Sequence, residues 1–83
     1  MSSELNLFVK PGCPWCTWVE EWLDEHGYRY ERIDVISDRR AYDRMIELSG
    51  QRRAPTLQVG DLILPDFGPD ELAVFLKKHS IAP

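Results

Sequence analysis

The segment Lys10-Pro11-Gly12-Cys13-Pro14-Trp15-Cys16 separates a short apolar run from a longer amphipathic one. The apolar run, residues 5–9, predicts a buried strand, and the Pro-Gly pair after it ends that strand. The amphipathic run predicts a helix that Gly27 closes, with an apolar stripe made of Trp18, Val19, Trp22, Leu23 and His26. We therefore expect the two cysteines to lie where a strand turns into a helix.

Cys13 and Cys16 are the predicted catalytic residues. With Cys13 at the N-cap, Pro14 takes the first helical position, where its missing N–H costs nothing. The Cys13 sulfur then faces free amide groups and the positive end of the helix dipole, which favour the nucleophilic thiolate. Residues three apart on a helix have Cβ atoms about 5–6 Å apart, so Cys16 is close enough for a disulfide. We expect Cys13 to attack and the less exposed Cys16 to resolve the mixed disulfide.

The remaining chain alternates strands and helices. The expected elements are, in order, a strand over residues 28–35, a helix capped by Ser37 or Asp38 and ended by Gly50, strands over residues 56–59 and 62–64, and a helix from Gly68-Pro69. The first two strands enclose a helix, which predicts a right-handed parallel crossover. The sequence therefore predicts one α/β domain, residues 1–83, with three helices on a four-stranded mixed sheet.

Composition and charge narrow the functional class. The 83 residues are 43% apolar and 29% charged, as in an ordinary globular protein. A net charge of −4 gives no reason to expect nucleic acid or an anionic membrane as a partner. No run reaches the ~18–20 apolar residues of a membrane span, and we expect a cytoplasmic monomer. All seven arginines fall in the middle third, so one face could still attract a small anion.

Two other interpretations of the cysteine pair stay open. In a reducing compartment, a close pair is more often catalytic or metal-binding than a structural disulfide. The pair supplies half of a tetrahedral zinc site, but His26 and His79 are placed at helix ends away from it. The other alternative is an inert buried pair, which the accessible strand-to-helix turn disfavours. Redox chemistry is the favoured interpretation.

The segment from Lys10 to Cys16 resembles the active site of dithiol glutaredoxins, in which a lysine and two residues precede Cys-Pro-aromatic-Cys. The resemblance covers almost the whole chain and includes Gly50-Gln51-Arg52-Arg53-Ala54-Pro55 before the third strand. It implies a thioredoxin-like fold with sheet order 2-1-3-4. It also implies a cis bond that turns the Ala54 backbone and Pro55 towards Cys13. In such a protein no cofactor is bound, glutathione is the reductant, and the substrates are protein disulfides or glutathionylated proteins.

The same resemblance implies glutathione-binding roles. Lys10, Gln51 and Arg52 stand where the family holds the glycyl carboxylate, and Asp70 marks the opposite part of the site. Trp15 lies beside the nucleophile and is expected to contact a partner. Simpler interpretations remain for three of them: a solvated loop for Arg52, packing on its own helix for Trp15, and helix-dipole complementation for Asp70.

The chain departs from the glutaredoxin pattern before its third helix. Many glutaredoxins have Gly-Gly, a small residue and Asp there, and amides of that turn bind the γ-glutamyl carboxylate. In this chain the turn is Pro65-Asp66-Phe67-Gly68-Pro69-Asp70, where Asp66 adds a negative charge and Pro69 removes a donor. The turn is closer to the Gly-Phe-x-Pro-Asp pattern of NrdH-type redoxins, which take electrons from thioredoxin reductase.

Four functions follow from these observations. A glutathione-dependent thiol–disulfide oxidoreductase is the leading interpretation, and an NrdH-type redoxin reduced by thioredoxin reductase is the first alternative. An iron–sulfur carrier, with a cluster bridged by Cys13 of two chains, is a second. Pro14 and Cys16 argue against it, because such family members usually have Cys-Gly-Phe-Ser. A non-catalytic binding module is the third, and it would not need Cys16.

Overall fold

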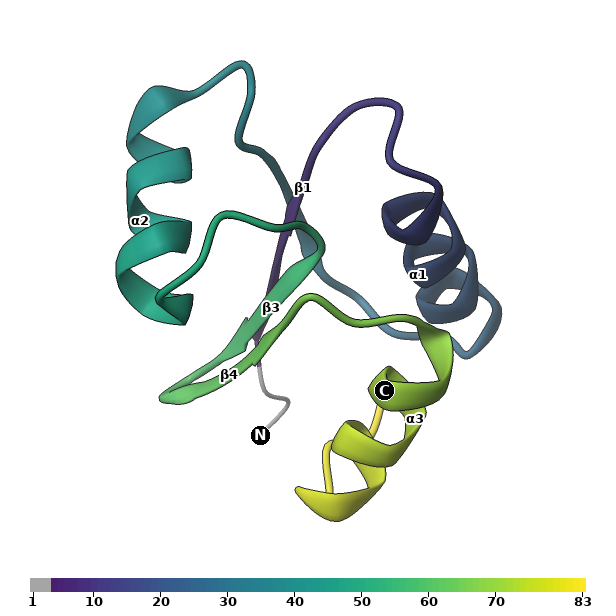
Figure 1. Cartoon of the computed structure of the whole chain (residues 1–83). Coiled ribbons are helices and arrows are strands. Elements are labelled where there is room, and N and C mark those ends of the chain that lie inside the picture. The colour runs from purple at the N-terminus through teal and green to yellow at the C-terminus, as the bar shows by residue number, and fades with distance from the viewer. Residues whose placement is uncertain (1–3) are drawn as a thin grey trace.

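The computed structural model describes residues 4–83 and arranges three helices around one four-stranded sheet (Figure 1). The elements in chain order are β1 (Leu5–Val9), α1 (Pro14–Glu25), β2 (Glu31–Asp34), α2 (Arg39–Ser49), β3 (Thr56–Val59), β4 (Leu62–Pro65) and α3 (Pro69–Lys78). The strand order is β2-β1-β3-β4, with β1 and β2 parallel and the other neighbours antiparallel. The predicted α/β fold and its 2-1-3-4 sheet are confirmed.

Strand β2 is shorter than the sequence predicts, because it begins at Glu31 rather than at residue 28. In the parallel pairing with β1, Glu31 lies opposite Asn6, so residue 28 lies beyond the first residue of β1. Tyr28 instead donates its hydroxyl to the carbonyl of Ile81 at 2.7 Å. The segment before β2 therefore holds the end of the chain rather than extending the sheet.

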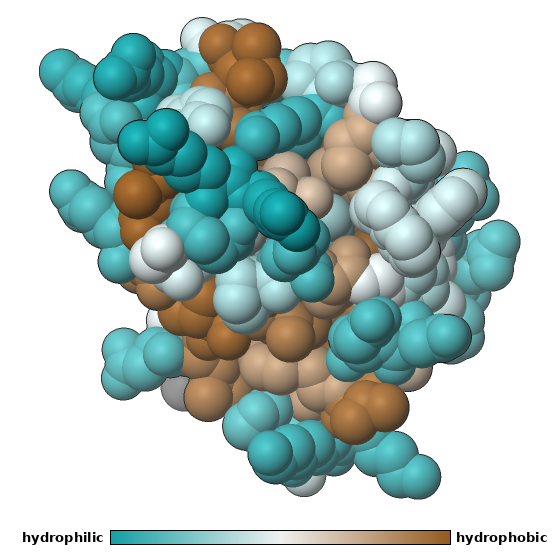
Figure 2. Space-filling model, viewed as in Figure 1, coloured by the Kyte–Doolittle hydropathy of each residue, from teal (hydrophilic) through white to brown (hydrophobic). Residues whose placement is uncertain are grey.

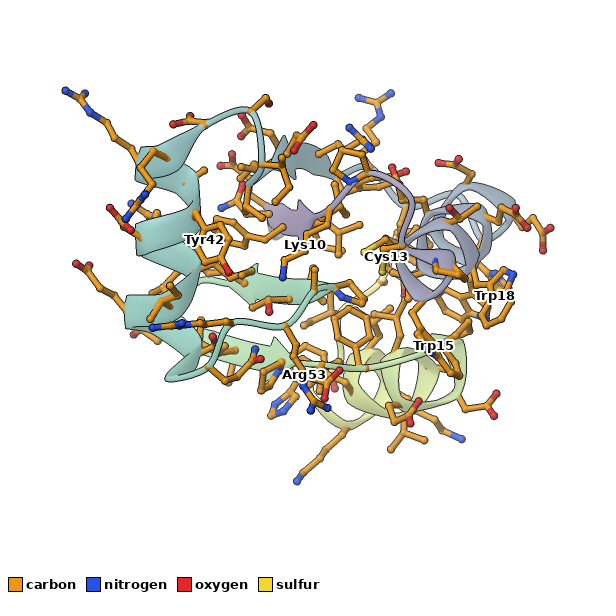
Figure 3. All side chains as sticks on the ribbon, turned by 45° about the horizontal axis from the view of Figure 1, so that its top comes forward. Lys10, Cys13, Trp15, Trp18, Tyr42 and Arg53 are labelled. Carbon is orange, nitrogen blue, oxygen red and sulfur yellow. The ribbon has the colours of Figure 1, made fainter. Side chains whose placement is uncertain are left out.

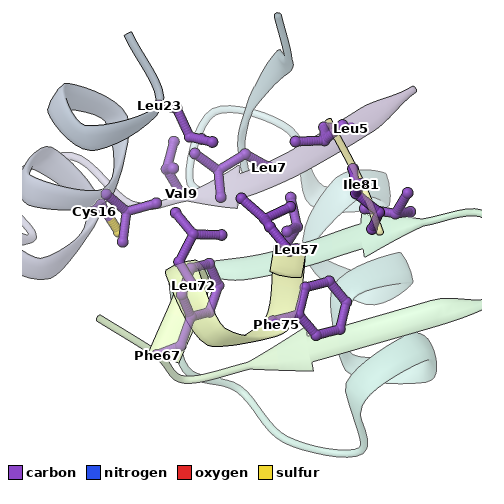
Figure 4. Packing of buried hydrophobic residues seen from close by; sticks show 13 residues of the cluster. Leu5, Leu7, Val9, Cys16, Leu23, Leu57, Phe67, Leu72, Phe75 and Ile81 are labelled. Atoms are coloured by element: carbon purple, nitrogen blue, oxygen red, sulfur yellow. The ribbon is translucent and has the colours of Figure 1, made fainter. Parts of the chain in front are cut away.

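The central strand β1 contributes to two cores, since successive side chains of a strand point to opposite faces. Leu7 and Val9 share a core with residues of α1 and α3, whereas Phe8 shares a core with residues of α2. Figure 1 shows α2 on one side of the sheet and α1 and α3 on the other. The larger core, drawn in Figure 4, consists of Leu5, Leu7, Val9, Cys16, Val19, Leu23, Leu57, Val59, Phe67, Leu72, Phe75, Leu76 and Ile81. Because Cys16 belongs to this core, the packing of α1 on the sheet fixes the position of the second thiol.

The predicted apolar stripe of α1 is partly wrong. Val19 and Leu23 are fully buried, but Trp18 is exposed and so is His26. The buried residues of α1 span an arc of about 60°, and Trp18 lies about 130° from its centre. Only a narrow side of α1 therefore touches the sheet, and Trp18 is left at the surface.

The surface around the edge strand β4 is less polar than that of the neighbouring helices. Figure 2 shows hydrophilic residues over most of the visible face and hydrophobic residues gathered around β4. Leu62, Ile63 and Leu64 of this edge strand are only half-buried. Within residues 4–83, none of the helices has the length and apolar character needed to cross a bilayer.

Candidate active site

The candidate site lies at the carboxyl end of β1, where the chain turns into α1. Cys13 has extended backbone angles and is the N-cap of α1, with Pro14 in the first turn, as predicted. Its sulfur accepts a hydrogen bond from the Cys16 N–H at 3.2 Å. An amide dipole and the start of the helix therefore point at the Cys13 sulfur, and both stabilise negative charge on it.

The two thiols have unequal environments. Both are free, but Cys13 is half-exposed whereas Cys16 is only 2% exposed. Burial, and then the neighbouring Cys13 thiol, raise the pKa of Cys16 to about 12. Cys16 therefore keeps its proton at neutral pH, and Cys13 is the thiol that an incoming disulfide can reach.

The loop before β3 faces the Cys13 sulfur. The Ala54–Pro55 peptide bond is cis, as the resemblance implies. The Cys13 thiol lies 3.9 Å from the Ala54 carbonyl oxygen, and the next residue, Pro55, is fully buried. The Pro55 carbonyl accepts a hydrogen bond from the Asp66 N–H at 2.9 Å, which ties this loop to the turn before α3. The structure thus brings the Ala54 carbonyl, which precedes the cis bond to Pro55, to the Cys13 thiol.

Lys10 and Arg52 also lie together, though not as two free cations. The Lys10 ammonium donates to the Arg52 carbonyl oxygen at 2.8 Å and lies 5.4 Å from the centroid of the Tyr42 ring (Figure 3). Arg52 is exposed and, with Arg39 and Tyr42, borders a hollow of about 280 Å³ beside α2. Lys10 therefore fixes the backbone of the loop while keeping two of its three donors for other partners.

Gln51 takes a structural role that the sequence did not indicate. Its amide nitrogen donates to the Ser49 hydroxyl at 3.2 Å and to the Arg53 carbonyl at 3.1 Å. Its side-chain oxygen accepts from the Arg53 N–H. The polar atoms of Gln51 are therefore engaged within the loop, and a glutathione-binding role for this side chain would require breaking those bonds.

Of the segments predicted to bind glutathione, the turn before α3 is the least suited to hold a carboxylate. The Gly68 N–H donates to the Glu71 carboxylate at 3.1 Å. The Asp66 carboxylate pairs with the Arg53 guanidinium at 3.3 Å. The Trp15 ring covers Gly68 so closely that a Cβ there would lie 2.9 Å from the ring edge. Glu71 was missed as a site residue, although a Glu three residues after an N-cap is the sequence signature of a capping box.

Asp70 is exposed in the first turn of α3. It borders a hollow of about 500 Å³ together with Val74, Lys78 and other residues of β4 and α3. That lining does not include Cys13 or Trp15, so the structure gives Asp70 no direct connection with the nucleophile. Its ligand-binding role stays a prediction.

Two other features lie apart from the thiols. Among residues 4–83, no three His, Cys, Asp or Glu side chains gather closely enough to hold a metal ion, so the chain offers no complete zinc site there. A cavity of about 790 Å³ lies between the start of β2 and the end of the chain and is bordered by Tyr28 and Tyr30. It is near the amino end of β1, whereas Cys13 follows the carboxyl end.

Known proteins share both the sequence and the fold. The Glutaredoxin family model matches residues 5–63. The chain is 30% identical over 69 residues to the glutaredoxin-like protein NrdH of Lactococcus lactis subsp. lactis (strain IL1403), covering 83% of this chain and 94% of that protein. It is 32% identical over 62 residues to the N-acetyl-S-hydroxy-L-cysteine reductase of Bacillus subtilis (strain 168), covering 72% and 67% of the two chains. The solved thioredoxin-like protein BC3987 superposes with a TM-score of 0.79 at 26% identity, over 87% of this chain and 99% of that one. The expected thioredoxin-like fold is confirmed.

Proposed function

The chain belongs to the glutaredoxin family and is a thiol–disulfide oxidoreductase, and we propose that it reduces protein disulfides with electrons from a protein donor rather than from glutathione. The reaction uses Cys13 as nucleophile and Cys16 as resolving thiol. The donor of the NrdH-type alternative, a flavoprotein of the thioredoxin reductase class, has the required chemistry, because it delivers two electrons to a disulfide.

The proposed reaction balances over two exchange steps. The Cys13 thiolate attacks one sulfur of the target disulfide, and the other target sulfur leaves as a thiolate and takes up a proton. Cys16 then loses its proton and attacks the Cys13 sulfur, which releases the second target thiol and leaves a Cys13–Cys16 disulfide. The target has gained two electrons and the redoxin has lost two, which the donor restores.

The hydrogen bonding at the N-terminus of α3 is the observation that favours a protein donor. In the glutaredoxin pattern this turn offers amides to the γ-glutamyl carboxylate of glutathione. Here the Gly68 amide is bound by Glu71, and Pro69 has no amide hydrogen. An incoming carboxylate would have to displace one carboxylate while Asp66 and Asp70 stand nearby in the chain. These contacts favour a donor that does not depend on this turn.

Glutathione is a second candidate donor, favoured by the cations on the other side of Cys13. Lys10 keeps free donors, and Arg52 is exposed next to it. Both are suited to the glycyl carboxylate of glutathione, although Gln51 is engaged elsewhere. Glutathione binding would then rest on one end of the tripeptide.

A coupled assay distinguishes the two donors. The protein is supplied with an insulin disulfide substrate and NADPH, either with thioredoxin reductase or with glutathione and glutathione reductase. We expect NADPH oxidation to be at least about tenfold faster with thioredoxin reductase. Equal or faster oxidation with glutathione would establish the second candidate instead.

A further inference from the structure

Two tryptophans of α1, the helix that Cys13 caps, remain at the surface. Trp15 is 54% and Trp18 is 48% exposed, and their rings meet edge to face with centroids 4.9 Å apart. Figure 3 shows both side chains on the outer side of α1, with Trp15 between α1 and α3 and Trp18 farther from Cys13. Trp15 is held in place by its contact with Gly68. Exposing two large aromatic rings is costly unless a partner covers them, and tryptophan is enriched among the residues that dominate binding energy.

The surface that continues from this pair is acidic. Helix α1 carries Glu20, Glu21, Asp24 and Glu25 and has no lysine or arginine. Glu20 pairs with Arg32 at 3.0 Å, whereas Glu21 and Glu25 are exposed and make no ion pair with any residue from 4 to 83. Trp18, Glu21 and Glu25 are spaced three and four apart, so they share one side of the helix. An indole face next to two uncompensated carboxylates fits an arginine or lysine side chain.

We propose that Trp18, flanked by Glu21 and Glu25, binds a cationic side chain of the protein whose disulfide reacts with Cys13. Trp18 and Glu21 lie about 7.5 and 12 Å beyond Cys13 along the helix axis and are turned about 140° and 80° from it around that axis, so each is about 15 Å from Cys13 over the helix surface. An extended peptide advances about 3.3 Å per residue, so the cation belongs four to five residues from the reacting cysteine. The inference rests on the proposed exchange at Cys13 and names its substrate class, disulfides flanked by Arg or Lys, whichever donor restores the dithiol.

The test uses two synthetic peptides with the same internal disulfide, one with arginine and one with glutamate four residues before a cysteine. Pre-reduced protein reacts with each peptide in a single turnover without any donor, and reduced peptide is measured by chromatography after acid quench. We expect the arginine peptide to react about tenfold faster at low salt, and this ratio to fall towards two at 0.5 M salt as the charges are screened. Because the ratio compares the rates of the two peptides on the same variant, any change in Cys13 reactivity affects both rates equally and cancels.

Two independent variants and one control complete the test. Trp18→Ala and the double variant Glu21→Gln/Glu25→Gln should each bring the ratio to within about twofold of one. Glu47→Gln, an exposed charge change on α2, should leave the ratio at its original value. A ratio near one in the unaltered protein, or a tenfold ratio that survives both variants, would overturn the docking inference alone. If neither peptide were reduced, the proposed exchange at Cys13 would fail with it.

Discussion

Cys13 and Cys16 stand three residues apart on one helix, yet their environments give them different chemistry. The Cys13 sulfur faces the helix start and receives the Cys16 N–H, while the Cys16 thiol is packed among core side chains (Figure 4). A thiol that attacks must be accessible, and a thiol that resolves needs only to reach its neighbour. The same helix therefore provides one accessible and one buried thiol, as the proposed attacking and resolving roles require.

The raised pKa of Cys16 predicts how the second exchange step depends on pH. Cys13 is first converted to a mixed disulfide with a small coloured thiol, and release of that thiol is followed by absorbance. Only the Cys16 thiolate attacks, and its fraction grows about tenfold per pH unit below its pKa. Because burial, the largest cause of the raised pKa, persists when Cys13 carries the coloured thiol, the release rate should rise by about that factor from pH 7 to 8 and keep rising from pH 8 to 9. A plateau already at pH 8 would contradict the buried, protonated Cys16, and Cys16→Ser should show no release.

The three helices begin in three different ways. Cys13 caps α1 with its sulfur, and Glu71 reaches back to the Gly68 amide at the start of α3. Asp38 caps α2, where its carboxylate accepts from the Arg40 N–H at 3.0 Å and the Ala41 N–H at 3.4 Å. Where no carboxylate of the chain binds the first amide groups of a helix, those amides can stabilise a reacting group. Two of the three starts serve stability, and the start at Cys13 serves the thiol.

Replacing the cap of α2 should lower stability without changing the redox site. Asp38→Ala leaves two amides of the first turn without their partner and should cost about 1 kcal/mol of unfolding free energy. The control Asp43→Ala removes an exposed pair with Arg39 on the same helix and should cost less than about 0.5 kcal/mol. Urea unfolding measures both. Equal losses in the two variants would argue against the capping role of Asp38.

Removing the carboxylate at the start of α3 should change donor preference. Glu71→Ala frees the Gly68 amide and deletes one negative charge, so activity with glutathione and glutathione reductase should rise about fivefold, while stability falls by about 1 kcal/mol. Glu47→Ala on α2 serves as the matched control and should change neither. An unchanged glutathione-coupled rate in a folded Glu71→Ala protein would mean that this contact does not select the donor.

The whole molecule brings three distant segments to one end of the sheet. β1 delivers the Cys13 turn, the loop before β3 places Ala54 against it, and the Pro55 carbonyl binds the Asp66 amide after β4. β1 and β3 are adjacent and antiparallel, so the end of one strand meets the start of the other. The site is therefore a consequence of the sheet order.

Much of this arrangement could be predicted from sequence, because local rules govern it. The N-cap at Cys13, the end of α2 at Gly50 and the hairpin after residue 59 follow from residue type and spacing. The cis bond before Pro55 came from the resemblance, not from local propensity. The exposure of Trp18 and the inward hydrogen bonds of Gln51 depend on how elements pack and how a loop closes, which no local pattern contains.

The division of labour between the two thiols can be measured by trapping the mixed disulfide. Cys16→Ser and Cys13→Ser are each mixed at pH 7 with a peptide whose one cysteine is joined by a disulfide to a small thiol that leaves as a stable anion, and intact mass and peptide mapping locate any adduct. Cys16→Ser should accumulate one peptide adduct on Cys13. Cys13→Ser should remain unmodified, or react at least about a hundredfold more slowly, because Cys16 is buried and protonated. An adduct that forms on Cys16 as quickly as on Cys13 would contradict the assignment of Cys13 as the nucleophile.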